Sequence, residues 1–315
     1  MSCFWSDKRF CWIVVASCVL EASFTVCFQL GIVVDEATLA GEERGAPNKR
    51  IIGMDNYLEK IHKEREWHNN NFNRHHFFNS KLFYSDDRQR YNYSYAKREM
   101  RRFLEEKIAR NNSFPSHPSL LIAPIGTGDD LKHLSFLTDD ITGVDVAQEA
   151  LDKVSNSQVK LMQCDMRKME CFSNDQFDIV VTPLFFHHFN GMHKIFVNEI
   201  FRVLKPSGIF ISLEPSNLHP LSWLTRPLRK VVGNITEQVE DESPFFPGQL
   251  LLAMKESGFE KVTLKGASFS HNRLPIWFAK LNNVFTHPMK SLPLLKYFAW
   301  VCLYSGQKPN RKQSW

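Results

Sequence analysis

From residue 119 to the C-terminus, short apolar runs alternate with stretches of helical periodicity. The strand candidates are residues 120–125, 141–146, 159–165, 177–184, 208–214, 261–266 and 298–304. The helix candidates between them are residues 147–154, 192–205 and 248–258. Such alternation predicts an α/β fold, in which a doubly wound, mainly parallel sheet carries helices on both faces.

The segment 54–112 has a different pattern, polar and aromatic, with two helical stretches. In the second stretch, the larger apolar side chains recur on one helical face while Lys and Arg fill the other. Those apolar residues are Tyr95, Met100, Phe103, Leu104 and Ile108. We therefore predict a helical cover over residues 54–112, followed by one α/β domain over residues 113–315.

Residues 1–53 form a third region, an N-terminal extension with two interpretations. The apolar run 10–34 has a basic residue pair before it and an acidic pair after it, which resembles a signal anchor. Glu21 and Gln29 interrupt the run, and a charge near the bilayer centre costs roughly 2.5 to 3.5 kcal/mol on insertion scales. Because Met54 opens a stretch typical of a soluble N-terminus, the extension is either a misassigned, dispensable start or a membrane anchor.

Composition narrows the class of protein. The chain has 315 residues with 43% hydrophobic, and its 39 basic and 34 acidic residues are interspersed, so nucleic acid is not expected as a partner. The seven cysteines show no CxxC or metal-type spacing. We therefore expect reduced thiols in a cytoplasmic protein, associated with a membrane if the run 10–34 is a real anchor.

The residues that follow each predicted strand are the candidates for ligand binding, because doubly wound sheets bind ligands at the carboxyl ends of their strands. Gly126 and Gly128 follow the first strand, in a turn where glycine allows close approach of a ligand. Asp145 ends the second strand, nineteen positions beyond Gly126, the spacing suited to an acid that binds a ribose. Asp145 has a second interpretation as a helix N-cap. Asp165 follows the third strand and either accepts from an adenine amino group or begins a turn.

The glycine turn, the two acids and the run FDIVV at 177–181 occur in a fixed order. With them, residues 117–308 resemble the class I S-adenosylmethionine-dependent methyltransferases, in particular the small-molecule group called type 11 or type 12. The resemblance implies a Rossmann-like sheet of seven strands with the last strand antiparallel, and S-adenosylmethionine as cofactor. The cofactor residues it implies are Gly126, Thr127, Gly128, Asp145, Val146, Asp165, Met166 and Thr182.

The sequence departs from this family in the glycine turn. Ile122 stands where the family has an acid, and Pro124 replaces the first glycine of its Gly-x-Gly-x-Gly turn. A catalytically inactive protein of the same fold, acting as a scaffold, is therefore the alternative. A dinucleotide dehydrogenase is disfavoured because Leu131 stands where its third glycine is required.

The acceptor side is expected after the fourth and fifth strands. His187 or His188 is a candidate general base, and Glu214 a candidate to bind an acceptor hydroxyl or close the pocket. Each also has a structural interpretation, as a packing, capping or turn residue. No metal is expected, since no acids and histidines cluster at ligand spacing. We predict O- or N-methylation of a small molecule.

An aromatic, leucine-rich insertion at 268–297 lies between the last two strands. It would enclose an apolar or glycolipid-like acceptor, contact a membrane or a second subunit, or roof the domain. The oligomeric state is not predictable from the sequence.

Overall fold

The computed structural model describes residues 86–111, 114–221, 245–271, 274–290 and 292–310. The predictions for the extension 1–53 and for residues 54–85 of the helical cover lie outside these ranges. None of the described helices is long and apolar enough to cross a membrane.

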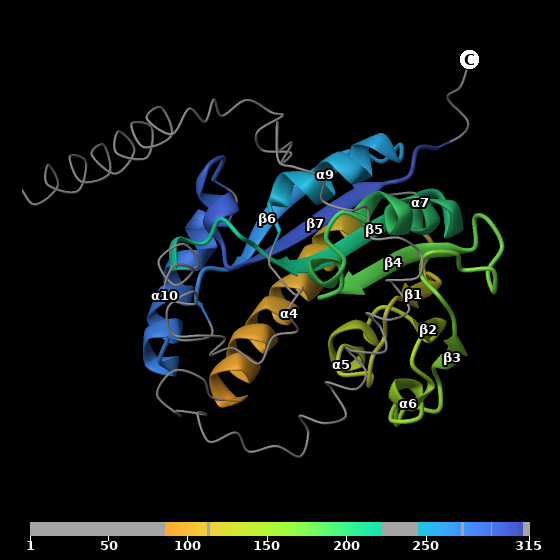
Figure 1. Ribbon diagram of the computed structural model, residues 1–315, viewed down its shortest axis with the longest axis horizontal. Coiled ribbons are helices and arrows are strands. Elements are labelled where there is room, and N and C mark those ends of the chain that lie inside the picture. The colour runs from red at the N-terminus through yellow and green to blue at the C-terminus, as the bar shows by residue number, and fades with distance from the viewer. Residues whose placement is uncertain (1–85, 112–113, 222–244, 272–273, 291, 311–315) are drawn as a thin grey trace, which may run out of the picture. The chain divides into compact units, whose positions relative to one another are not determined.

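A single seven-stranded sheet forms the centre of the fold, with the order β3-β2-β1-β4-β5-β7-β6 (Figure 1). Its strands are β1 Leu120–Ile122, β2 Ile141–Asp145, β3 Lys160–Gln163, β4 Phe177–Pro183, β5 Leu204–Pro215, β6 Glu260–Ser268 and β7 Val301–Gln307. The first five are parallel to one another, and β7 runs antiparallel between β5 and β6. The predicted strands and the antiparallel last strand are confirmed.

The burial of each strand follows its composition. Every residue of β1 and β2 is buried, as expected for apolar strands covered on both faces. By contrast, β3 begins with Lys160 and ends with Gln163, both exposed, and it lies at the edge of the sheet. Polar side chains on an edge strand discourage pairing with another chain.

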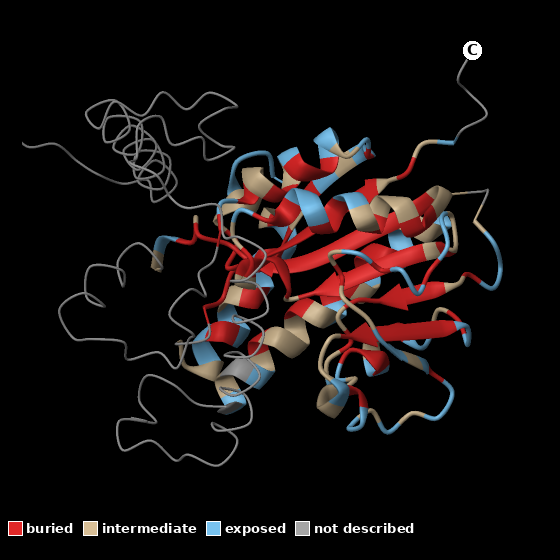
Figure 2. Cartoon of the chain, turned by 45° about the vertical axis from the view of Figure 1, so that its right-hand side comes forward, coloured by how far each residue is buried: buried red, intermediate tan, exposed pale blue. Residues whose placement is uncertain are grey.

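Helices cover the two faces of the sheet separately (Figures 1 and 2). One face packs against α7 His193–Val203 and α9 Pro247–Glu256, and the other against α4 Asp86–Ala109, α5 Leu131–Leu134 and α6 Gln148–Leu151. Along β5, Phe210 joins the first core while Ile209 and Ile211 join the second. This alternation is the two-residue period of a strand buried on both faces.

Helix α4 confirms the helix predicted before the domain, although it begins earlier in the chain. Its buried face carries Met100, Phe103 and Leu104, which pack with strands of the second core. This part of the cover is therefore an integral layer of the fold.

The junction of α7 with β5 differs from the expectation of a helix that ends near Lys205. The helix ends at Val203, and β5 begins at once with Leu204 paired to Phe177. The next paired residue of β5 is Ile209, so Pro206 lies in an irregular stretch of the ladder. Its missing N–H costs no ladder hydrogen bond there, which is why proline is tolerated.

The insertion between β6 and β7 contains a helix that the sequence reading did not identify. It comprises α10 Ile276–Met289 and the short 3-10 helix η2 Leu295–Phe298. A second 3-10 helix, η1 Phe186–His188, follows β4.

Candidate active site

The predicted ligand-binding residues follow strands that all point the same way. Gly126, Asp145, Asp165, Thr182 and Glu214 come from the ends of β1, β2, β3, β4 and β5 in turn. Parallel strands bring these ends to one edge of the sheet, where α/β proteins bind ligands.

The loop after β1 has backbone geometry suited to a close ligand. Gly126 has φ +55° and Gly128 has φ +83°, a left-handed region that favours glycine. A Cβ built on Gly126 would meet nothing within 4 Å. The backbone at Gly126 therefore borders open space that an adenosyl group can fill, so the loop fits the cofactor.

Asp145 connects this loop to the turn after β2. Its Oδ2 accepts a hydrogen bond from the Gly126 N–H at 3.0 Å, and its Oδ1 accepts from the Ala147 N–H at 2.9 Å. No side-chain cap bond is present at the start of α6, where Ala147 is the N-cap residue. The carboxylate thus sets the spacing between the glycine loop and the neighbouring Val146.

Ile122, at one departure from the family pattern, and Ile125, next to the other, pack inside the domain. Ile122 is fully buried in the core beneath α4 and α5. After Pro124, the side chain of Ile125 lies over Gly143, where an added Cβ would come within 2.3 Å of Ile125 Cδ1. In this chain the first turn of the loop is therefore held by contacts between β1 and β2.

The turn after β3 carries the residues predicted to contact adenine. Both carboxylate oxygens of Asp165 pair with the guanidinium of Arg167, the shortest contact being 2.6 Å. Met166 is buried in the core. The structure thus places Asp165 in a charged pair that sequence spacing did not indicate.

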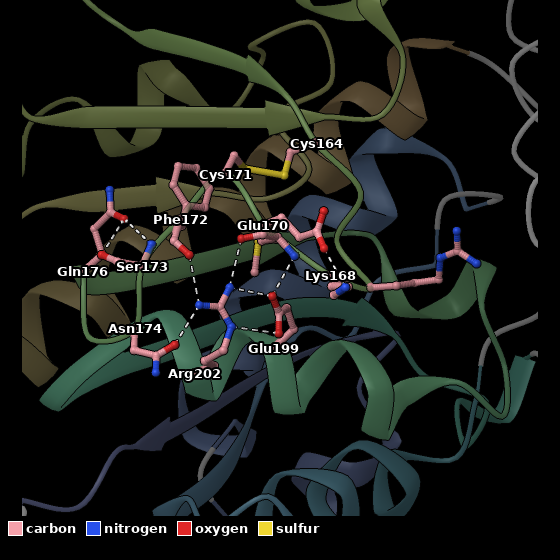
Figure 3. Close-up of polar contacts among 12 residues, drawn as sticks. Cys164, Lys168, Glu170, Cys171, Phe172, Ser173, Asn174, Gln176, Glu199 and Arg202 are labelled. Carbon is pink, nitrogen blue, oxygen red and sulfur yellow. Dashed lines mark hydrogen bonds and ion pairs between the residues drawn. A yellow bond between two sulfur atoms is a disulfide. The ribbon is translucent and has the colours of Figure 1, made fainter.

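A disulfide and a half-buried arginine hold this turn in place (Figure 3). Cys164 is bonded to Cys171, so the prediction of reduced thiols is wrong for this pair. The spacing of seven residues is not a recognisable motif, but the turn after β3 folds back and brings the two sulfurs together. Arg202 of α7 donates to the carbonyl oxygens of Met169 and Phe172, each bond at about 3 Å. The cytoplasmic location stays a prediction.

On the acceptor side, Glu214 is completely buried and accepts hydrogen bonds from η1. Its Oε1 accepts from the backbone N–H groups of Phe185 at 2.7 Å and Phe186 at 2.9 Å. Its Oε2 lies 2.8 Å from Nδ1 of His187. These donors compensate the desolvation of a buried carboxylate, and they fix both η1 and the ring of His187.

The two predicted histidines lie ring against ring. Their centroids are 4.1 Å apart, with His187 buried and His188 half-buried. A carboxylate can only accept, so Nδ1 of His187 carries the proton in this contact. In the neutral ring Nε2 then keeps a lone pair, the arrangement of a histidine general base oriented by a carboxylate.

His193, which the sequence analysis did not single out, lies beneath this pair. Its Nε2 is 3.2 Å from the carbonyl oxygen of Phe186. Burial lowers the pKa of His193 to about 4. This ring is therefore neutral at physiological pH, and it supports η1 from within the core.

Thr182 is the fourth-strand residue predicted to contact the cofactor. It is fully buried, and its Oγ1 is one of the described side-chain atoms without a hydrogen-bond partner. An unpaired buried hydroxyl is costly, and a ligand polar group would remove that cost.

A polar cluster that only tertiary structure reveals lies beyond β5 and β6. The rings of His219 and His271 are 5.5 Å apart although 52 positions separate them in the chain. Burial lowers the pKa of His219, and its Nδ1 and the hydroxyl of Ser270 are buried without partners. The sequence analysis did not predict that these residues lie together.

A cavity of about 500 Å³ opens beside the glycine loop, lined by Thr127, Gly128, Asp129, Leu131 and residues 155–158. Neither Asp145 nor Asp165 lines it. In the ranges that the structure describes, no three His, Cys, Asp or Glu side chains are grouped to hold a metal ion. The expectation of a metal-free site remains a prediction.

The fold and the site together define the class of protein. A sheet of order β3-β2-β1-β4-β5-β7-β6 with one antiparallel strand, a glycine loop after β1 and an acid ending β2 is the class I S-adenosylmethionine-dependent methyltransferase arrangement.

Residues 123–212 match the family model described as a methyltransferase domain. Together with the fold, this match supports an S-adenosylmethionine-dependent methyltransferase of class I, with S-adenosylmethionine as the methyl donor.

Among curated proteins, the chain is similar to the demethylmenaquinone methyltransferases of two Leptospira interrogans strains. Each is 28% identical over 203 residues, covering 54% of this chain and 81% of the relative.

Solved structures with a similar fold include a possible histamine N-methyltransferase from Thermotoga maritima. It is 13% identical, with TM-score 0.46, covering 68% of this chain and 99% of that one. A Haemonchus contortus phosphoethanolamine N-methyltransferase is 16% identical, with TM-score 0.44, covering 65% of this chain and 53% of that one.

Proposed function

We propose that this methyltransferase acts on an apolar, hydroxyl-bearing small molecule, with His187 as general base. The observation that carries the proposal is the contact between His187 Nδ1 and the buried Glu214 carboxylate at 2.8 Å. It orients a basic Nε2 at the edge of the sheet that also carries the glycine loop. In this role Glu214 is a positioning residue.

The cofactor residues are proposed from the same edge. The backbone at Gly126, Thr127 and Gly128 lies against the adenosyl group, and Asp145 with Val146 binds the ribose. Asp165 and Met166 lie beside adenine, and Thr182 uses its unpaired hydroxyl toward the cofactor. When bound, S-adenosylmethionine supplies an electrophilic methyl group on a sulfonium.

The protein's part in the reaction is alignment and proton removal. His187 Nε2 would take the proton of the acceptor hydroxyl as its oxygen becomes the nucleophile. The bound S-adenosylmethionine would supply the methyl group to that oxygen and would be left as the neutral thioether S-adenosylhomocysteine. His188 lies half-buried beside this ring, where it can contact the acceptor.

The apolar character of the acceptor is inferred from two observations. The insertion 268–297 contributes aromatic and leucine side chains beyond β6. The Leptospira relatives are named for demethylmenaquinone. That compound therefore belongs in the acceptor panel, together with apolar phenols, hydroxylated lipids and, for N-methylation, apolar amines.

Calorimetric titration of S-adenosylhomocysteine into the full chain tests the cofactor site. We expect binding in the parent protein, at least about tenfold weaker binding in Asp145→Ala, and no change in Asp152→Ala. Asp152 is a matched control because its carboxylate pairs only with the exposed Gln148 amide among the hydrogen bonds found. Equal affinity in the two variants would contradict the assignment of Asp145.

Transfer of a radiolabelled methyl group to the acceptor panel tests turnover. We expect the parent protein to form a labelled product. Loss of this product in His187→Gln, in a variant that still binds S-adenosylhomocysteine, supports His187 as the general base. Binding of the cofactor without turnover on any acceptor would favour the scaffold alternative.

A further inference from the structure

Helix α10 exposes a stripe of large apolar side chains. Trp277 and Val284 are each 69% exposed, Phe285 55% and Leu281 54%, and Phe278 is also exposed. At 3.6 residues per turn these positions span roughly 120° of the helix circumference. This is the width of the stripe that an ordinary surface helix turns toward the core.

The opposite side of α10 is small and polar, and it is the side that packs on the protein. Ala279, Asn283 and Thr286 are buried. The Tyr95 hydroxyl of α4 donates to the Asn283 carbonyl oxygen at 3.4 Å. Just beyond the helix, Lys290 forms a buried ion pair with Glu99 at 2.9 Å. The helix is thus anchored through polar contacts with its apolar side outward.

The apolar surface continues beyond the helix. Leu292, Leu294 and Leu295 are also exposed. With the stripe of α10 they make up eight of the thirteen exposed large hydrophobic side chains that the described part of the chain contains. We call these eight side chains the α10 surface. Exposed large apolar side chains gathered in one segment of the chain are typical of an interaction site.

Charge indicates which partner this surface fits. The chain has no Asp or Glu after Glu260, while Lys280 and Lys296 lie within the insertion. Lys280 is exposed at one edge of the stripe. Helices that lie in the interface of a membrane with anionic lipids have this composition. They combine tryptophan, phenylalanine and leucine with cationic side chains.

We propose that the α10 surface docks on a lipid bilayer that contains anionic headgroups. The apolar stripe enters the boundary between headgroups and acyl chains, and Lys280 and Lys296 contact the anionic phosphates. A second copy of the chain fits less well, because a two-fold contact through α10 would bring the lysines of one copy toward those of the other, while Glu99 is already paired with Lys290.

Docking would place the acceptor side of the domain close to the bilayer. The Asn282 side chain donates to the Phe269 carbonyl oxygen at 3.0 Å, and His219 contacts that same oxygen. Helix α10 is therefore bonded to the loops at the carboxyl edge of the sheet. The inference stands on exposure and charge, and it does not require the proposed acceptor.

Vesicle flotation of the full chain tests the proposal. Vesicles of phosphatidylcholine alone are compared with vesicles that also contain phosphatidylglycerol. The double substitution Trp277→Ser with Leu281→Ser is the test variant, and Ile195→Ser with Leu252→Ser is its control. All four residues are exposed and belong to helices, but the control pair lies on α7 and α9.

We expect the parent protein and the control to float with the anionic vesicles, and the test variant to bind at least about tenfold more weakly. Lys280→Glu should weaken binding to anionic vesicles, while Lys255→Glu on α9 should not. Because residues 10–34 are present in every variant, any binding through them is common to all.

Three results would overturn the proposal. One is a parent protein that binds neither kind of vesicle, and another is equal binding by the test variant and its control. The third is a dimer of the lipid-free parent protein in sedimentation equilibrium, together with a monomeric test variant. The α10 surface would then join two copies of the chain. None of these measurements uses S-adenosylmethionine or an acceptor, so their failure is distinct from failure of the proposed function.

Discussion

Replacing Glu214 by glutamine tests whether a carboxylate sets the proton position on His187. Of its two oxygens, Oε1 accepts from Phe185 N–H, Phe186 N–H and the Ser212 hydroxyl, and Oε2 accepts from the backbone N–H and Nδ1 of His187. A glutamine has one acceptor oxygen, which is best used where three donors converge. Its amide nitrogen then faces the backbone and the ring of His187.

Two consequences follow from this placement. The buried backbone N–H of His187 loses its acceptor, which costs about 1 to 3 kcal/mol of unfolding free energy. The ring responds by accepting at Nδ1, which moves its proton to Nε2. The lone pair needed by a general base is then lost, and kcat should fall by about 10² to 10⁴.

The measurements are kcat by radiolabelled methyl transfer, affinity for S-adenosylhomocysteine by calorimetry, and unfolding free energy in urea. Ser212→Ala is the matched control, since the Ser212 hydroxyl is shared between the Thr182 carbonyl oxygen and Glu214 and does not contact the ring. The reasoning is refuted if Glu214→Gln is folded, binds S-adenosylhomocysteine normally, and keeps kcat within about threefold of the parent.

Three further predictions concern stability. Burial lowers the pKa of His193 to about 4, so its contribution to the free energy of unfolding is full above pH 6.5 and is lost as pH falls toward 4, about 3 kcal/mol in total. In urea unfolding, the free energy of unfolding of His193→Gln should therefore fall less steeply between pH 6.5 and 4 than that of the parent. Arg202→Lys should lower the free energy of unfolding by about 1 to 3 kcal/mol and weaken S-adenosylhomocysteine binding, because the turn after β3 loses two hydrogen-bond donors; unchanged values in both assays would contradict this. Gly143→Ala should cost about 1 to 3 kcal/mol through its clash with Ile125, and Ile125→Ala in the same chain should cost less than the sum of the two single changes.

The elements of the fold were predictable because their signals are local. Strands such as 141–145 and 177–183 are near-continuous apolar runs, and burial on both faces requires that composition. The glycine loop, Asp145 and Asp165 were found because each comes directly after one of the predicted strands. Helix α10 was not predicted, because the insertion 268–297 was interpreted only as a segment that encloses an acceptor, contacts a membrane or a second subunit, or roofs the domain.

The candidate site was less predictable, since its geometry depends on residues far apart in sequence. His187 and His188 were predicted as candidates because they follow the fourth strand. The contact of His187 with Glu214 was not predictable, since 27 positions separate the two residues in the chain. The disulfide between Cys164 and Cys171 was contrary to expectation, because spacing does not report how a turn folds back. The role of each predicted site residue stays a proposal until the variants are measured.

The amino-acid sequence by itself determined which segments form strands, their mainly parallel sheet and the edge proposed to bind the ligand, because hydrophobic period and turn residues act over a few neighbouring positions. Only the tertiary structure decided the partners of the polar side chains. Glu214 beneath η1, Lys290 against Glu99 and His219 beside His271 are pairings between distant strands and helices. A buried polar group takes whichever partner the packing of the whole domain brings within reach.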